Sequence, residues 1–265
     1  MDTTTLLQSQ EFSSGVWGVY KPAGQTPLQT LDELRLQQPT LANTLLTYAG
    51  RLDPMAEGLL LVLAGDMVHK KPEFLGLDKI YTVTALLGIA TDSYDLLGMP
   101  VFNSGHSMSI LDNSGQLLAQ ATPVLQSLVG TTTLPLPPFS SPPHQGKPLF
   151  WWARKQPTVH IAPLRTTHIT NISTPHFNTI EPSELSTRLH TYIPRVHGDF
   201  RQADILGTWD ALLQSPQKPF TTITFTVHCQ SGTYIRSLVH ELGAKLGTGA
   251  CIYQLVRTHV GNYQL

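Results

Sequence analysis

The apolar and polar positions of the chain predict strands that alternate with helices. Residues 222–229 alternate Ile, Phe and Val with Thr and His, which is typical of a strand with one buried face. Residues 79–88 are rich in β-branched and aromatic residues and place Tyr81, Val83 and Ala85 on one face of another strand. Residues 59–64 form an unbroken apolar run, which favours a strand covered on both faces.

Proline and glycine positions mark the ends of further elements. A strand that begins near residue 16 should end at Lys21 and Pro22, and a helix is expected over residues 28–36. Leucines recur every four residues from 238 to 246 before two glycines, so a helix should begin near residue 235. Residues 135–148 are too rich in proline for regular structure and should leave the main sheet. The pattern predicts one α/β or α+β domain over residues 1–265, without a linker.

Charge is unevenly distributed along the chain. The 17 Lys and Arg residues against 18 Asp and Glu give a net charge of −1, which does not by itself indicate a nucleic-acid partner. The region of about 113–180, however, contains no acidic residue, and it combines basic with aromatic side chains. Its candidate RNA contacts are Lys147, Arg154 and Lys155, next to Phe150, Trp151 and Trp152. A solvated loop with a few core aromatic residues fits the same composition.

Several classes of protein are disfavoured by composition. The longest apolar run is far shorter than the roughly 20 residues of a membrane-spanning helix, and the N-terminus does not resemble a signal peptide, so we expect a cytoplasmic protein without a membrane partner. Cys229 and Cys251 are expected to be core thiols. Asp92 and Asp95 are typical of a turn and lack further ligands at metal-binding spacing, and no nucleotide-binding motif is present. We therefore predict neither metal nor cofactor.

Three charged residues are candidates for chemistry. Asp53 precedes Pro54, a pattern most often explained by capping of a short turn. Arg51 lies two residues earlier and would point to the same side of an extended segment, where it could screen Asp53 or contact a phosphate. A surface salt bridge is its simpler interpretation. Arg236 lies at the start of the last predicted helix, where the helix dipole disfavours a cation, so a buried carboxylate is its expected partner.

Four segments follow one another along the chain: GVYKPAGQT (18–26), GRLDPMAEGLLLVLAG (50–65), KIYTVTALLGIATDSYDLLG (79–98) and SGTYIRSLVHELGAKLGTGA (231–250). Taken together and in this order, they resemble the TruB family of tRNA pseudouridine synthases. QGKPLFWWAR (145–154) resembles the family's RNA-gripping insertion, and YQLVR (253–257) its closing core strand. The resemblance covers most of the chain. It implies a mixed-sheet catalytic domain that isomerises uridine to pseudouridine without cofactor or metal.

The resemblance also implies roles for individual residues. Asp53 matches the catalytic aspartate, and Arg236 matches the arginine that pairs with it. Tyr81 matches the tyrosine that stacks on the flipped base, and Tyr234 a neighbouring tyrosine of the active site. Lys21 and Pro22 match a motif that supports the site. With Tyr48 and Arg51, these tyrosines and Arg236 are the predicted substrate-binding residues.

The chain departs from the family pattern at three positions. Tyr48 stands where relatives carry histidine, Glu57 where they usually carry threonine, and Pro143 where the insertion commonly carries lysine. These changes bear on substrate choice and affinity more than on the type of reaction. The chain ends shortly after the last motif, so we expect no C-terminal PUA-type RNA-binding domain.

The leading hypothesis is a monomeric enzyme that acts on the T-loop uridine at position 55 of tRNA. A second hypothesis keeps the chemistry but changes the RNA, because Tyr48 and the expected absence of a PUA domain concern substrate recognition. A third is a non-catalytic RNA-binding or RNA-folding module, which the presence of Asp53, Tyr81 and Arg236 argues against. A glycosidase that uses Asp53 as its acid lacks a recognisable partner carboxylate.

Overall fold

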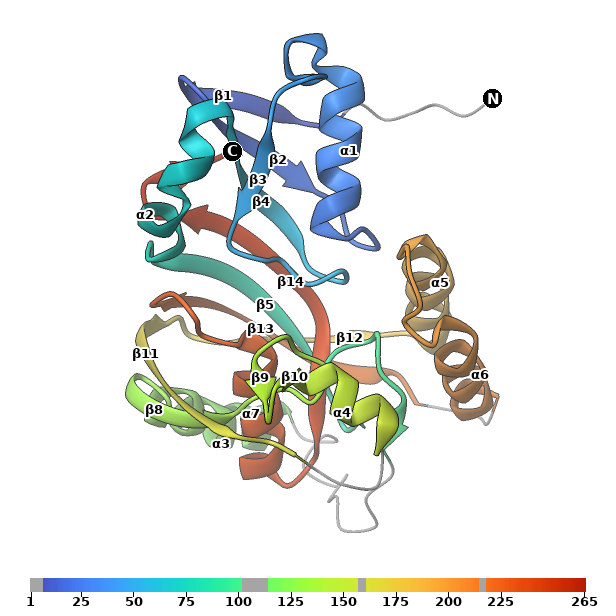
Figure 1. Cartoon of the computed structure of the whole chain (residues 1–265). Coiled ribbons are helices and arrows are strands. Elements are labelled where there is room, and N and C mark those ends of the chain that lie inside the picture. Colours follow the sequence, from blue (N-terminus) through green and yellow to red (C-terminus); the bar gives the residue numbers. More distant parts are fainter. Residues whose placement is uncertain (1–6, 102–113, 157–160, 215–217) are drawn as a thin grey trace.

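One large mixed β-sheet runs through the computed structural model of the chain (Figure 1). The structure describes residues 7–101, 114–156, 161–214 and 218–265. Within these residues, eleven strands join in the order β1-β2-β4-β14-β5-β13-β11-β8, with β3 paired to β4, β12 to β13 and β15 to β14. The pairing of β4 with β14 is parallel, and the other pairs are antiparallel. The predicted mixed-sheet α+β fold is confirmed.

The strands of this sheet are β1 (Ser9–Ser13), β2 (Val16–Lys21), β3 (Leu46–Ala49), β4 (Glu57–Ala64), β5 (Lys79–Leu87), β8 (Gly130–Pro135), β11 (Leu164–Ile172), β12 (His176–Ile180), β13 (Phe220–Cys229), β14 (Ala250–Val260) and β15 (Tyr263–Gln264). Two short pairs lie outside it, namely β6 (Ala90–Thr91) with β7 (Pro100–Val101), and β9 (Pro143–His144) with β10 (Lys147–Pro148). The α-helices are α1 (Pro27–Gln37), α2 (Lys71–Leu75), α3 (Ser114–Ser127), α4 (Leu149–Lys155), α5 (Pro182–Tyr192), α6 (Gln202–Leu213) and α7 (Ile235–Leu246). Short 3-10 helices are η1 (Pro39–Leu41), η2 (Gly65–Lys70) and η4 (Ile193–Arg195).

The central strands are buried as their sequences predict. In β4 the odd-numbered leucines from 59 to 63 pack with Phe74 of α2, while Leu60 and Val62 join the main core, so both faces are covered. In β5 and β13 every second residue is buried, including Tyr81. Both cysteines are buried free thiols, as expected.

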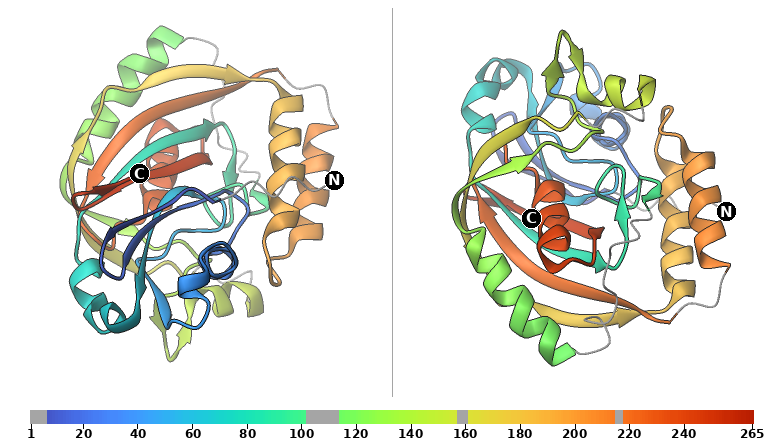
Figure 2. Two further views of the ribbon diagram at one scale, coloured as in Figure 1. Left: turned by 90° about the horizontal axis from the view of Figure 1, so that it is seen from above. Right: turned by 90° about the horizontal axis from the view of Figure 1, so that it is seen from below.

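Helices cover the sheet in separate groups (Figures 1 and 2). The apolar residues of α7 and α3 pack together against β5, β13 and β14, and this cluster forms the main core. The α5 and α6 helices lie side by side at one end of the sheet and form a second core with residues of the 89–97 segment. The predicted helix over 28–36 is α1. Thr26 and Gln29 cap its N-terminus with a reciprocal capping box.

The basic and aromatic region of about 113–180 contributes in two ways. Its strands β8, β11 and β12 extend the main sheet. Residues 136–156, here called the appendage, leave the main sheet as the proline pattern predicts, and they carry β9, β10 and α4. The expectation that residues 135–148 lack regular structure was wrong, because β9 and β10 form a short antiparallel pair within them. Residue 113 and residues 157–160 of this region lie outside the described residues. Among the helices that the structure describes, none combines the length and the apolar character needed to cross a membrane.

Gly58 in β4 makes a close approach that a side chain would prevent. Its φ is 102°, and a Cβ would lie 2.4 Å from the carbonyl oxygen of Arg257. We expect Gly58→Ala to lower the free energy of unfolding by about 1–3 kcal/mol, measured by urea denaturation. Gly207→Ala in α6, where nothing lies within 4 Å, is the matched control and should raise it by up to about 1 kcal/mol. Equal effects of the two changes would contradict this account.

Candidate active site

A cleft of about 690 Å³ brings together motifs that are far apart in the chain. Its walls come from the 50–54 loop, strand β5, the 93–97 segment, the appendage and the start of α7. The predicted site residues that line it are Tyr48, Arg51, Asp53, Tyr81, Arg154, Tyr234 and Arg236. Lys21, Pro22, Lys147 and Lys155 do not line this cleft.

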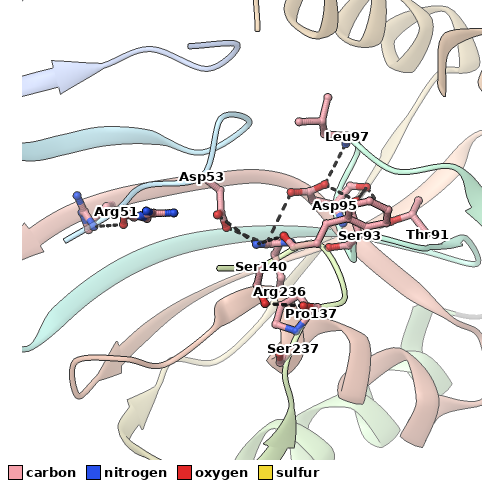
Figure 3. Close-up of polar contacts among 12 residues, drawn as sticks. Arg51, Asp53, Thr91, Ser93, Asp95, Leu97, Pro137, Ser140, Arg236 and Ser237 are labelled. Carbon is pink, nitrogen blue, oxygen red and sulfur yellow. Dashed lines mark hydrogen bonds and ion pairs between the residues drawn. The ribbon is translucent and has the colours of Figure 1, made fainter. Parts of the chain in front are cut away.

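Asp53 and Arg236 form a bidentate ion pair in the cleft (Figure 3). The arginine donates from Nε to Oδ2 at 2.7 Å and from Nη2 to Oδ1 at 3.1 Å. The arginine side chain is 5% exposed and the aspartate side chain 35%, so the carboxylate faces the cleft while its partner is buried. The pair that the position of Arg236 predicted is therefore present. The side chain of Asp53 points to Arg236, and it is the backbone oxygen of Asp53 that accepts from Ala56 and closes the turn.

Asp95 is a second carboxylate beside Arg236, although its sequence pattern indicated only a turn. Its Oδ2 lies 3.8 Å from Nε of Arg236, opposite Asp53, and the side chain is 7% exposed (Figure 3). Ser93 donates to its Oδ1 at 2.6 Å, and the amide of Leu97 at 3.0 Å. Burial raises the pKa of Asp95 to about 6, although the positive charge of Arg236 opposes the shift.

The remaining donors of Arg236 hold two neighbouring segments. Nη1 donates to the carbonyl oxygen of Ser93 at 2.8 Å, and both terminal nitrogens donate to that of Phe139 at 3.3 Å. Burial alone lowers the pKa of Arg236, but the charges of Asp53 and Asp95 outweigh it and raise that pKa. The guanidinium therefore stays charged, and its hydrogen bonds fix the positions of the 93–95 segment and the appendage around Asp53.

Two buried cations hold the loop that carries Asp53. Lys21 is fully buried and donates from Nζ to the carbonyl oxygens of Pro22, Gln25 and Pro54, at 2.9, 2.8 and 3.2 Å. Arg257 is 1% exposed and donates to the carbonyl oxygens of Arg51, Leu59 and Gly50. These contacts grip the chain on both sides of Asp53. Burial lowers the pKa of Lys21 to about 7, while the charge of Asp53 counteracts part of the shift.

Three tyrosines line the cleft from different elements. Tyr81 of β5 is 8% exposed, and burial raises the pKa of its hydroxyl despite the nearby charge of Arg257. Tyr234 precedes α7, and burial together with Asp53 raises its pKa, against the charges of Arg236, Arg165 and Arg51. Tyr48 of β3 is half-buried, and Nζ of Lys71 lies 5.3 Å from its ring centroid. An aromatic wall next to a carboxylate suits a flat base beside a reacting sugar.

The other two departures from the family pattern lie outside the cleft lining. The carboxylate of Glu57 accepts from the hydroxyl of Tyr20 at 3.0 Å and from the amide of Gln254 at 2.6 Å, so its charge is held by neighbours. Pro143 lies in β9 and is exposed.

The appendage is tied to the segment between α5 and α6. Arg154 donates to the carboxylate of Asp199 at 3.1 Å and also to its backbone oxygen. Arg201 lies 3.9 Å from the ring centroid of Phe139 and forms a bidentate pair with Asp92, at 2.7 and 3.2 Å. Residues 199–201 therefore form part of the cleft wall, which no motif in the sequence indicated.

The two remaining RNA-contact candidates are exposed but do not line the cleft. Lys147 and Lys155 are exposed, and Nζ of Lys147 lies 5.9 Å from the ring centroid of Trp151. Phe150, by contrast, is 41% exposed and lines the cleft. In the described part of the chain, no group of three or more His, Cys, Asp or Glu side chains is placed to hold a metal ion.

Comparison with known proteins gives the family. Residues 40–193 match the model of the TruB family pseudouridylate synthase, N-terminal domain, and this match covers more than half of the chain. The chain belongs to the TruB family. The matched segment contains Asp53, Tyr81 and Asp95, while Arg236 lies beyond it.

Relatives and solved structures agree with the family. A tRNA pseudouridine synthase B of Oleidesulfovibrio alaskensis is 29% identical over 95% of this chain and 64% of its own length. One of Blochmanniella pennsylvanica is 31% identical over 82% of this chain and 64% of its own length. The chain thus spans about 64% of the length of these curated relatives.

Two solved structures show the same fold at 18% identity and a TM-score of 0.50. One is an H/ACA RNP bound to a substrate RNA containing 2'-deoxyuridine, in which the matching chain is covered to 47%, and the other is a Cbf5-Nop10-Gar1 complex, with 48% covered. Each match covers 92% of the present chain. These two matches show that the chain shares its fold with both structures over most of its length.

The raised pKa of Asp95 predicts a pH-dependent contribution to stability. Between about pH 4 and 6 the unfolded carboxyl has lost its proton while the folded one retains it, so the folded state binds more protons and stability falls as pH rises. Asp95→Asn removes this titration. The difference in unfolding free energy between wild type and variant should change by about 1–3 kcal/mol across this range, measured by urea denaturation. A constant difference would contradict the pKa shift.

Proposed function

We propose that this chain is a tRNA pseudouridine synthase with Asp53 as its catalytic residue. The observation that carries the proposal is the carboxylate of Asp53, which opens into the cleft of a TruB-family fold while Arg236 binds both of its oxygens. The names of the relatives support tRNA as the substrate. The family match supports pseudouridine formation as the reaction.

The reaction needs a group that can act at the sugar. The N1–C1′ bond of a uridine breaks, the base turns, and C5 joins C1′; C5 loses its proton and N1 gains one, so the reaction is an isomerisation. A carboxylate can serve as the nucleophile or base close to C1′. The ion pair with Arg236 orients the carboxylate of Asp53, and the loop contacts of Lys21 and Arg257 hold its backbone.

The tyrosines suit the base of the target nucleotide. This nucleotide must leave its stack to reach a carboxylate inside a cleft, and an aromatic face compensates part of the stacking that it loses. Tyr81 takes this role in the proposal, because it lies in the wall of the cleft that holds Asp53. Burial raises the pKa of its hydroxyl above the usual value, so this group is a still weaker acid than an exposed tyrosine. Tyr234 and Tyr48 complete the binding surface.

As the target nucleotide we propose the T-loop uridine at position 55 of tRNA. The enzyme would act as a monomer in the cytoplasm. The appendage contributes to the RNA grip through the exposed Phe150, which lines the cleft, while Arg154 ties the appendage to Asp199. Lys147 and Lys155 would contact RNA only outside the cleft. Tyr48 favours a second candidate substrate, another RNA that undergoes the same reaction. The reason is that tyrosine replaces the histidine of relatives at a position expected to contact the RNA. Mapping of pseudouridine in total RNA, with and without the enzyme, separates the two substrates.

Asp53→Asn should abolish turnover. Asparagine keeps the shape of the side chain but loses the negative charge that acts at C1′. Tritium release from tRNA carrying 5-tritiated uridine should fall by about a thousandfold or more, because formation of the C5–C1′ bond expels that hydrogen. Asp210→Asn on the surface of α6 removes the same charge outside the cleft and should retain wild-type release. Turnover that survived Asp53→Asn would exclude Asp53 as the catalytic residue.

A further inference from the structure

The cleft has an excess of positive charge, although the chain as a whole has a net charge of −1. The acidic residues in its lining are Asp53, Asp95 and Asp199. The basic residues are Arg51, Lys79, Arg154, Arg165, Arg201, Arg236 and Arg257. A surplus of cations around a cleft attracts a polyanion, and the cations without partners inside the protein are the ones that can bind it.

Most of the cations already have partners. Arg236, Arg154 and Arg201 form ion pairs with aspartates. Arg257 and Lys79 are buried and donate to backbone carbonyls, and Lys79 also donates to Ser231. The side chains of these five residues therefore make contacts within the protein that stabilise the walls of the cleft.

Arg51 and Arg165 differ from the rest. Both are exposed, and within the described residues neither forms an ion pair with a carboxylate. Arg51 donates one hydrogen bond, from Nη1 to the hydroxyl of Ser141. Arg165 packs its guanidinium against Gly232, where an added Cβ would lie 2.9 Å from Nη2. Each therefore presents unused donors on a charged, planar group, the geometry that binds phosphate oxygens in pairs.

The two arginines line the same cleft from different elements. Arg51 comes from the Asp53 loop and Arg165 from strand β11. The positive charges of both act on the hydroxyl of Tyr234, which borders the cleft next to the Asp53–Arg236 pair. Arg165 also lines a small neighbouring recess with Gly232 and Tyr234. They therefore lie close to the position of the target nucleotide, but outside the ion pair that holds Asp53.

We propose that Arg51 and Arg165 bind the backbone phosphates of the RNA around the target nucleotide and hold its sugar over Asp53. This rests on the proposed function, in which an RNA nucleotide enters the cleft. Two contacts made from separate elements fix the direction in which the strand passes the carboxylate. Arg165 is thus a substrate-positioning residue that no sequence motif indicated, and Arg51 receives a defined role beside it.

The test compares Arg51→Gln and Arg165→Gln with wild type in two assays. In the first, binding of fluorescently labelled tRNA is measured from about 50 to 300 mM KCl. Each variant should reduce the slope of log K against log salt by about one unit, since one phosphate contact is lost. In the second, tritium release should show KM raised about tenfold at constant salt, with kcat within about threefold of wild type.

Two controls separate a phosphate contact from other roles. Lys245→Gln removes a charge that pairs with Glu241 on the surface of α7, and it should leave slope and KM unchanged. Arg165→Lys should retain most of the slope, because lysine also neutralises a phosphate. If both Arg165→Lys and Arg165→Gln kept the wild-type slope of log K against log salt, Arg165 would not contact a phosphate. The proposal would then be wrong.

The binding assay does not depend on turnover. If wild-type protein bound tRNA with the expected salt slopes but released no tritium, the phosphate contacts would stand and the proposed reaction on tRNA would fail. If turnover were normal but both glutamine variants kept the wild-type slope and KM, the phosphate contacts would be refuted and the reaction would stand. A loss confined to kcat would equally overturn the proposal.

Discussion

The ion pair between Asp53 and Arg236 is the interaction on which the site depends. It joins two residues 183 positions apart, one in the loop before β4 and the other in the first turn of α7. A buried guanidinium needs negatively charged partners, and the carboxylate of Asp53, at 2.7 Å, lies closer to Arg236 than that of Asp95, at 3.8 Å. The fold therefore keeps loop and helix in contact, and the contact places a carboxylate at the cleft.

The loop of Asp53 needs further support, because one ion pair fixes a side chain but not the backbone behind it. Lys21 and Arg257 supply this support by donating to carbonyl oxygens on either side of Asp53. Carbonyl oxygens are neutral acceptors, so these cations bind the loop without competing for the carboxylate of Asp53. Burial lowers the pKa of Lys21 because it disfavours the charged ammonium group. The fold therefore holds this loop in place with a cation whose burial is itself unfavourable.

Local patterns predict the elements of this fold better than they predict its site. The strands β4, β5 and β13 and the helix α7 follow from the spacing of apolar residues, since each buries a face that its own sequence defines. Asp95 could not be found in this way. Its Asp-Ser-Tyr-Asp context is ordinary turn chemistry, and only the tertiary fold brings it to 3.8 Å from Arg236. Arg201 and Phe139 meet for the same reason, across separate elements.

The same distinction explains why net charge is a poor guide to the proposed RNA partner. The net charge of the whole chain includes the aspartates that pair with Arg154, Arg201 and Arg236, as though they were free. It also includes acidic residues that lie outside the cleft. What an RNA phosphate meets is the charge that remains after internal pairing. In the cleft that remainder is positive, and its exposed part lies on Arg51 and Arg165, in the same cleft as the proposed catalytic carboxylate. A nearly neutral chain can therefore present a local binding site for a polyanion, provided that folding consumes its acidic groups in structural pairs.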